Sequence, residues 1–583
     1  MRITKVRIRN FRSFDADSPT IHIPNLLHPI SIIGPNNAGK TNLLDAIAKA
    51  LLAIPAGPTT FSSDDFHLRN ADDKIEINVL IDPPLMSTNA YNTISPMPVI
   101  ELHVETKDGE LDVKHVFANE QGKQIFNVRS VKRSRNVNFT DEQKEVLEAY
   151  QKSGVESVFK WRDKIPAYYI HHGTIMDQLR INRYTLLGKV LEKIRLRFGE
   201  LDNKLPRPEI GLFSPLEGKP RYEVFRLVSD FLENVVLSTA ELDSLINSVS
   251  KTLLSQLQIK DEDFNVRFGI PSAEELFKNL QFQVTDAQSK PHMPVSSMGQ
   301  GFVSLFVVAL FRAILDSDTT GGNIFLIEEP ETYLHEHFQE YYYRVLLELS
   351  IRNQVIYTTH SKKFVDVFEP RSIISLRNVS NMQTEIVQSP STGIEFPTVI
   401  GDFELHNPED FPRYLRSLEP NVGNIAFANK VIIVEGPHDV LAYKTVLDPV
   451  FNLSLNNISI VAAWGKDPIP FLVSFCQTFK ISCFVVHDWD IDSYDLSWLQ
   501  RNAEMPTSLE PGEKQQLTKN RKIYFLLDAQ HIHHNVRNLE TVLSIADKGA
   551  PSVFERVSGR SLQEIQSQFP GFLPSSLVDF VRT

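Results

Sequence analysis

The sequence has little cysteine and no excess of positive charge. Only two cysteines, Cys476 and Cys483, occur in 583 residues, which excludes a disulfide framework and a cysteine-based zinc site. The formal net charge is −12, so no global basic field attracts nucleic acid. Any contact with DNA must come from local basic patches, or from metal ions held among carboxylates. The shortage of cysteine favours a reducing cytoplasm.

Long hydrophobic runs are also missing. The longest, Phe302 to Leu310, reaches Leu315 only through Arg312 and is too short to span a bilayer. Residues 1–11 alternate apolar and basic side chains, which predicts a strand and not a signal peptide. There is no internal repeat or low-complexity tract, and the length predicts two to four domains. We therefore expect a cytoplasmic protein with several domains.

A phosphate-binding loop is the most specific motif present. Residues 34–41 read Gly-Pro-Asn-Asn-Ala-Gly-Lys-Thr and fit the pattern G-x-x-x-x-G-K-[ST] between an apolar run and a helical pattern. Backbone N–H groups at the helix start would hold the phosphates. Lys40 would neutralise the β- and γ-phosphates, and the Thr41 hydroxyl would bind Mg²⁺. The predicted ATP-binding residues of this loop are Gly34, Asn36, Asn37, Gly39, Lys40 and Thr41.

Three downstream segments supply the other parts of an ATPase. The apolar run 323–327 ends in acids, where Glu328 would help hold the metal through water and Glu329 would polarise the attacking water. The apolar strand 354–359 ends at His360, which we interpret as a sensor of the γ-phosphate. Small residues at 295–301, among them Ser297 and Gly299, open an apolar helix and predict an anion site.

A second constellation of acids lies near the C-terminus. Glu435 follows an apolar strand and precedes Asp439 in a Glu-Gly-x-x-Asp pattern, and a later apolar strand ends in Asp488 and Asp490. The ligand sites of open α/β sheets lie at the carboxyl ends of strands. A group of four carboxylates requires divalent metal, and two metals are the usual means of attacking a phosphodiester. These four residues are therefore predicted ligands of Mg²⁺ or Mn²⁺.

The order of the ATPase parts resembles an ABC-type ATPase head of the SMC-like kind. In that family the Ser/Gly signature of one subunit closes on the triphosphate of another, which implies an ATP-dependent homodimer or higher homo-oligomer. The stretch 8–14 looks like the first strand of those heads, which implies that Arg12 approaches the nucleotide. The sequence departs from the family at Met298, where glycine is common, and at Glu328, where many relatives have aspartate. Asp65 is a weak candidate for the glutamine-loop residue.

The acids at the C-terminus resemble those of a Toprim domain, the metal-dependent fold of topoisomerases, primases and some nucleases. That resemblance implies Glu540 as a further metal ligand and Lys548 as a catalytic residue that holds or neutralises the scissile phosphate. An SMC-like head followed by a Toprim domain is the layout of OLD-family nucleases (overcoming lysogenisation defect). The family implies a metal-dependent DNA endonuclease or nickase governed by ATP, in antiviral defence, with a helicase or a reverse transcriptase with its RNA as partner in some relatives.

The expected fold class is α/β, an SMC-like P-loop ATPase with a helical insertion followed by a Toprim domain. Residues 129–263 would either pack on themselves or form a dimerisation arm. Alternative functions are a clamp or repair ATPase whose Toprim unit binds DNA without cutting, and nucleotidyl transfer as in primases; no tyrosine is placed for topoisomerase chemistry. The predicted domains are 1–128 and 264–400 for the two ATPase halves, 129–263 for the insertion, 401–429 for a linker and 430–583 for the Toprim domain.

Overall fold

The computed structural model divides into two compact units. The first comprises Met1–Ala167 with Thr320–Thr583, and the second comprises Tyr168–Thr319. The described residues are 1–88, 94–107, 109–119, 124–130, 165–171, 217–237, 283–285, 292–294, 299, 301, 306, 307, 309, 322–379, 383–400, 403–407, 409–500, 503–546 and 549–583. In the second unit they include helix α5 (Arg221–Leu237) and an antiparallel pair, β9 (Gln283–Thr285) and β10 (His292–Pro294). Most of the predicted helical insertion therefore lies outside the described residues.

The ATPase part of the chain contains two six-stranded sheets. One is antiparallel in the order β2-β1-β4-β5-β6-β7, with β1 Arg2–Arg9, β2 Ile21–His22, β4 Ile75–Thr88, β5 Ile94–Lys107, β6 Glu110–Ala118 and β7 Gln124–Ser130. The other has the order β14-β13-β3-β12-β11-β8, with β3 Ile30–Ile33, β8 Ala167–Ile170, β11 Ile324–Glu328, β12 Gln354–Thr358, β13 Ile373–Val379 and β14 Gln383–Gln388. Helix α1 (Lys40–Ala50) follows β3, and α9 (Glu336–Ser350) joins β11 to β12.

The parallel strands of the second sheet bring distant motifs together. β3, β11 and β12 lie side by side, with β12 in the middle, although β3 ends at Ile33 and the other two begin at Ile324 and Gln354. All four or five residues of each strand are buried, which explains why apolar residues predominate in their sequences. The carboxyl ends of the three strands carry the phosphate loop, Glu328 and the segment leading to His360.

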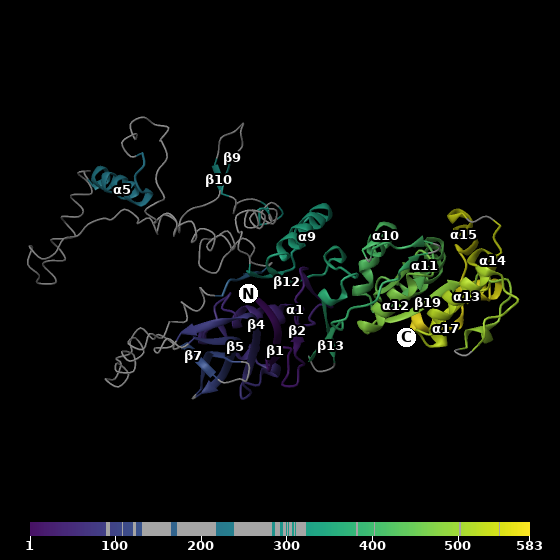
Figure 1. Ribbon diagram of the computed structural model, residues 1–583, viewed down its shortest axis with the longest axis horizontal. Helices are drawn as coiled ribbons and strands as arrows, with labels where there is room; N and C mark the ends of the chain where they lie inside the picture. Colours follow the sequence, from purple (N-terminus) through teal and green to yellow (C-terminus); the bar gives the residue numbers. More distant parts are fainter. Residues whose placement is uncertain are drawn as a thin grey trace, which may run out of the picture. The chain divides into compact units, whose positions relative to one another are not determined.

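The C-terminal part is a four-stranded parallel sheet in the order β18-β17-β19-β20. Its strands are β17 (Lys430–Val434), β18 (Ile458–Ala462), β19 (Ser482–Asp488) and β20 (Ile532–Asn535). Its helices are α11 (Pro437–Phe451), α12 (Ile469–Thr478), α13 (Pro511–Tyr524), α14 (Leu539–Leu543), α15 (Ala550–Val557), α16 (Leu562–Gln568) and α17 (Ser575–Arg582) (Figure 1). Alternate residues of β17 and β19 enter two separate cores on the two faces of the sheet.

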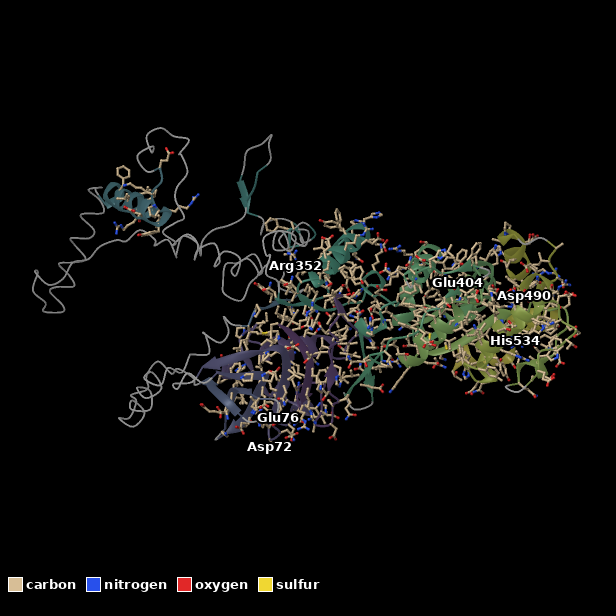
Figure 2. All side chains as sticks on the ribbon, viewed as in Figure 1. Asp72, Glu76, Arg352, Glu404, Asp490 and His534 are labelled. Atoms are coloured by element: carbon tan, nitrogen blue, oxygen red, sulfur yellow. The ribbon has the colours of Figure 1, made fainter. Side chains whose placement is uncertain are left out.

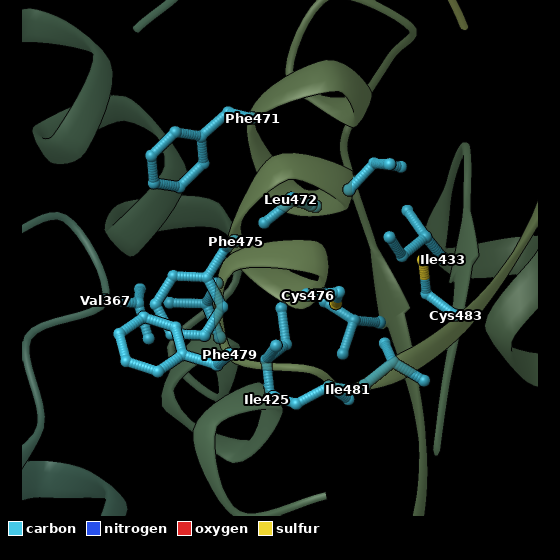
Figure 3. Close-up of a cluster of buried hydrophobic side chains, with 14 of the residues drawn as sticks. Val367, Ile425, Ile433, Phe471, Leu472, Phe475, Cys476, Phe479, Ile481 and Cys483 are labelled. Carbon is cyan, nitrogen blue, oxygen red and sulfur yellow. The ribbon is translucent and has the colours of Figure 1, made fainter. Parts of the chain in front are cut away.

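One of these cores is continuous with the ATPase part. It contains Ile33 and Val367 from the ATPase side together with Phe475 and Phe479 from the region of α12, and Figure 3 shows Val367 beside these aromatic rings. The two cysteines also lie here as buried free thiols. Shared burial of this kind supplies apolar stabilisation that neither part would have alone.

The predicted linker over 401–429 is ordered where the structure describes it. The pair β15 (Val399–Ile400) and β16 (Phe403–Glu404) precedes helix α10 (Asp410–Leu418). Phe411 and Leu415 lie on one face of α10 and are fully buried in the shared core. The prolines and charges favoured a linker, but apolar residues four apart on a helix share a face and pack together.

Candidate nucleotide and metal sites

The phosphate loop connects β3 to α1 with two glycines in positions that other residues cannot occupy. Gly34 has φ 150° and Gly39, the residue before α1, has φ 94°. A Cβ atom on Gly34 would lie 2.2 Å from the Leu376 carbonyl oxygen, and one on Gly39 would lie 2.6 Å from the hydroxyl oxygens of Ser13 and Thr384. The loop is therefore packed against its surroundings, and both glycines are required by its backbone.

The side chains of Lys40 and Thr41 occupy positions suited to a nucleotide. Lys40 Nζ donates hydrogen bonds to the carbonyl oxygens of Gly34 and Pro35, each at 2.9 Å. Thr41 Oγ1 donates to Glu328 Oε1 at 2.5 Å, which joins the phosphate loop to the end of β11. Burial lowers the pKa of Lys40, while the carboxylates that follow β11 raise it. An anionic phosphate would add a partner for this partly desolvated ammonium group.

The acids after β11 meet the loop after β12. Glu329 adopts a left-handed backbone conformation, with φ 42°, and its N–H donates to the Thr358 carbonyl oxygen at 3.1 Å. Glu329 Oε1 lies 3.6 Å from His360 Nε2. Burial, followed by the charge of Lys40, lowers the pKa of His360, which favours its neutral form at pH 7. Glu328, Glu329 and His360 thus gather beside the phosphate loop.

Glu331 also belongs to this cluster and was not predicted. Its Oε1 accepts a hydrogen bond from the His360 backbone N–H at 2.6 Å, and burial raises its pKa. The signal was present in the sequence as a third acid in the run Glu-Glu-Pro-Glu, but a pattern cannot distinguish an acid that fixes the histidine loop from one that faces solvent.

Arg12 lies next to α1 and is held by two carboxylates. Its guanidinium donates to Asp45 Oδ2 at 2.7 Å and to Asp65 Oδ1 at 2.9 Å. Its predicted approach to the nucleotide remains a prediction. Asp65, the weak glutamine-loop candidate, is buried beneath this arginine. Asn36 and Asn37 are exposed on the phosphate loop.

Two parts of the predicted machinery cannot be placed. Ser297 and Lys548 lie outside the described residues. Gly299 is described as an exposed residue of the second unit. The roles of all three remain predictions.

The acids near the C-terminus lie at the carboxyl ends of β17 and β19, which are adjacent parallel strands. Glu435 directly follows β17, and its Oε2 accepts a hydrogen bond from the Asp488 backbone N–H at 3.1 Å. Asp439 lies in the first turn of α11, where its Oδ2 accepts from the Gly436 N–H at 2.9 Å. Parallel strands place their carboxyl ends at one sheet edge, so the predicted residues come together as the motif required.

Burial and mutual repulsion raise the pKa values of these acids. Burial, with the charges of Asp488 and Asp490 added, raises the pKa of Glu435 to about 7. Burial likewise raises the pKa of Asp488 to about 6, and Asp490 and Glu540 add to the effect. Burial, then Asp488 and Glu435, also raises the pKa of Asp439. Glu540 is half-buried at the start of α14, and its charge acts on Asp439 and Asp488.

Two of the predicted ligands, Asp488 and Asp490, have polar side-chain partners. Asn535 Nδ2 donates to Asp488 Oδ1 at 3.0 Å, and Lys466 Nζ donates to Asp490 Oδ2 at 2.8 Å. Among the described residues, no three histidine, cysteine, aspartate or glutamate side chains stand arranged to hold a metal ion. The metal ligands accordingly remain predictions. The donor chemistry fits a divalent cation nonetheless, because burial and neighbouring acids raise the pKa values of Glu435, Asp439 and Asp488, and a bound cation would offset both effects.

Lys466 and Asn535 are parts of this edge that sequence reasoning missed. Both are buried, and each contacts one of the predicted acids. Figure 2 labels Asp490, the acid bound to Lys466, in the C-terminal part of the chain. In the sequence, each is only a single polar residue near the end of an apolar strand, and such residues occur at the ends of many strands.

Comparison with known proteins gives two family matches. The family described as AAA ATPase domain matches residues 1–152 and 124–365. The family described as Overcoming lysogenization defect protein-like, TOPRIM domain, matches residues 427–490. Together with the observed sheets, these matches confirm the expected α/β fold class, an ATPase followed by a Toprim domain.

Three known proteins are similar over much of their length. An OLD nuclease from Thermus scotoductus is 24% identical over 559 residues, covering 93% of this chain and 92% of that protein. Endonuclease GajA from Bacillus cereus is 21% identical over 467 residues, covering 77% and 68%. A crystal structure of the SmcHead bound to the C-winged helix domain of ScpA is 14% identical and covers 66% of this chain and 97% of that one, with a TM-score of 0.34.

In the part of the chain that the structure describes, every helix is too short or too polar to cross a membrane.

Proposed function

Since this chain belongs to the OLD family, with an ATPase domain ahead of an OLD-like Toprim domain, we propose that it is an ATP-binding, divalent-metal-dependent DNA endonuclease or nickase. The observation that carries the proposal is the meeting of Glu435 and Asp488 at the ends of two adjacent parallel strands. Burial and neighbouring acids raise their pKa values to about 7 and about 6 despite the charge of Lys466, so a bound cation would stabilise their ionised forms. The names of the relatives, a nuclease and an endonuclease, support cleavage as the reaction.

The residues that would hold Mg²⁺ or Mn²⁺ are those of the acidic edge, and we define this set as the carboxylate cluster: Glu435, Asp439, Asp488, Asp490 and Glu540. A bound divalent ion would supply an activated water and stabilise the departing oxygen of the phosphodiester. The chain's own contribution is orientation. The Asp488 N–H fixes the Glu435 carboxylate, Asn535 fixes Asp488, and the first turn of α11 fixes Asp439.

ATP binding would govern this site through strand β13, which touches both parts of the first unit. On the ATPase side, the Leu376 carbonyl oxygen closes over Gly34, and Asn378 Nδ2 donates to the Asn36 carbonyl oxygen at 3.5 Å. Between them, the Arg377 guanidinium donates to the carbonyl oxygens of Phe479 and Lys480, at 2.5 and 2.7 Å.

Those two carbonyl groups lie between the end of α12 and the start of β19, and β19 ends at Asp488. A change in the phosphate loop on binding ATP would therefore reach the carboxylate cluster through one strand and one helix end. We propose this route as the means by which ATP gates cleavage. A closed dimer of ATPase heads, with Ser297 and Gly299 of one subunit facing the triphosphate of the other, would accompany it.

Family membership supports a role in defence against phage in the cytoplasm. The chain would act alone, or together with a helicase or a reverse transcriptase. Phage should then form fewer plaques on cells that express the wild-type chain than on cells that express the Asp488→Ala variant. Equal plaque counts across a broad phage panel would contradict the role of cleavage in defence.

Incubation of the purified chain with supercoiled plasmid tests the reaction itself. With Mn²⁺ or Mg²⁺ we expect nicked or linear plasmid, and with a chelator we expect none. Asp488→Ala should lower the rate by at least about 100-fold while leaving ATP binding intact, because it removes a predicted ligand. Lys40→Ala is the matched control, which should weaken ATP binding and preserve the metal-dependent cleavage that is measured without ATP.

Three results would overturn the proposal. Full cleavage by Asp488→Ala would contradict the metal assignment. Unchanged plasmid that is still bound by the protein would favour the clamp. New polymer from added nucleotides would favour nucleotidyl transfer.

A further inference from the structure

Lys466 enters the carboxylate cluster from a turn after β18 that has an unusual backbone. Trp464 and Gly465 both have positive φ, 59° and 118°. The Gly465 N–H donates to the Glu435 carbonyl oxygen at 3.0 Å, so the turn folds back over the end of β17. This geometry carries Lys466 inward, and its side chain is only 2% exposed. Burial of a lysine at this depth requires charged or polar partners.

The partners of Lys466 come from two other elements. Nζ donates to Asp490 Oδ2 at 2.8 Å and to Gln516 Oε1 of α13 at 3.2 Å. One turn further along α13, Asn520 Nδ2 donates to the Trp489 carbonyl oxygen at 2.9 Å. Asp490 itself has φ 54°. Lysine and α13 thus fix both the backbone and the carboxylate of the segment that follows β19.

The charge of Lys466 also acts beyond Asp490. It opposes the effect of burial on the pKa values of Glu435 and Asp488, and so favours their ionised forms. The ammonium group therefore contacts Asp490 and acts by its charge on two further members of the carboxylate cluster.

We propose that Lys466 is a positioning residue of the metal site, holding the Asp490 carboxylate in the orientation in which it can bind a divalent ion. The inference rests on the proposed function, because it assumes that the carboxylate cluster takes up metal. Groups that orient metal ligands commonly contribute 10- to 100-fold to metal affinity. With one oxygen of Asp490 bound to Lys466, the other oxygen is available to the cation.

Mn²⁺ binding to the full-length, nucleotide-free chain tests this without any nuclease assay. Free Mn²⁺ is measured by electron paramagnetic resonance, and the site is identified as the one that Asp488→Ala removes. Lys466→Met should weaken Mn²⁺ binding by about tenfold or more. Lys519→Met is the matched control. Lys519 lies on α13 and pairs with Asp467, which is next to Lys466 in the chain, at 2.9 Å, and its loss should change the affinity by less than about twofold.

A double-mutant cycle separates positioning from general destabilisation. If Lys466 acts through Asp490, adding Lys466→Met to Asp490→Asn should weaken Mn²⁺ binding no further than Asp490→Asn alone. Additive losses, or binding by Lys466→Met as tight as that of the wild type or tighter, would overturn the inference. Circular dichroism confirms folding, and Lys466→Gln replaces the methionine variant if that variant does not fold. Wild-type protein that binds no Mn²⁺ would instead refute the proposed metal-dependent function.

Discussion

At the scale of single residues, burial controls the ionisation of the carboxylate cluster. Glu435 and Asp488 have pKa values raised to about 7 and about 6 by desolvation and by neighbouring acids. The folded chain therefore retains protons that the unfolded chain releases near pH 4. Their contribution to stability is present at low pH and is lost as the pH rises through 6 and 7. Near neutral pH, a divalent cation would replace the missing protons.

The raised pKa values of these two acids predict that the stabilising effect of Mg²⁺ depends on pH. Mg²⁺ should raise the melting temperature more at pH 8 than at pH 5.5, because protons compete for the same oxygens at the lower pH. The measurement is thermal unfolding with Mg²⁺ and with a chelator at both pH values, without nucleotide. Asp488→Asn should reduce the difference by at least about half. An equal effect of Mg²⁺ at both pH values would contradict the assignment.

Residues that belong to a motif were predictable from the sequence, and solitary partners were not. Glu435, Asp439 and Asp488 stood at fixed spacings after apolar strands, and the structure brings them to one edge. Lys466 had no such spacing, and its contact with Asp490 depends on a turn with two positive φ values. Of the two residues with positive φ, only Gly465 is a glycine, so Trp464 gives no sign of the turn in the sequence.

At the scale of elements, the strands of the parallel sheets were the most predictable features. Strands buried on both faces are predominantly apolar, so β3, β11, β12, β17 and β19 appear as apolar runs with polar residues mainly at their ends. Helix α10 was missed because its prolines and charges favoured a linker. Only packing against the shared core shows why Phe411 and Leu415 are apolar. The role of α13 as a support for Asp490 depends on tertiary contacts that no local pattern contains.

Strand β13 is the element that we expect to carry the ATP signal. Arg377→Gln removes its hydrogen bonds to Phe479 and Lys480 and leaves the phosphate loop intact. ATP affinity and the basal nicking rate should each change by less than about twofold. The ratio of nicking rates with and without a non-hydrolysable ATP analogue should fall to about one, because the loop no longer communicates with the end of α12.

Arg371→Gln serves as the control for that experiment. Arg371 precedes β13 and pairs with Glu369 at 2.6 Å, within the ATPase part. The control should keep the wild-type response to the nucleotide. If Arg377→Gln also keeps it, the coupling route through β13 is wrong.

At the scale of the whole molecule, the resemblance to SMC-like heads predicts an ATPase site shared between two copies of the chain. The phosphate loop, Glu328, Glu329 and His360 would form one side of that site. An SMC-like head would complete the site with the signature of another copy. The net charge of −12 adds long-range repulsion between copies, so association should depend on a specific bound ligand.

Glu329→Gln provides the strongest test of ATP-dependent association. Glu329 lies 3.6 Å from His360 and is the predicted residue that polarises the attacking water. The glutamine side chain of the variant cannot act as a base, so ATP hydrolysis should slow by at least about 100-fold and ATP should stay bound. With ATP and Mg²⁺, light scattering after size-exclusion chromatography should then show a larger molar mass than without nucleotide. Lys40→Ala should show no increase, because its triphosphate contact is lost. A mass for Glu329→Gln that is the same with and without ATP would exclude assembly of heads around the nucleotide, and gating would then have to act within a fixed assembly through β13.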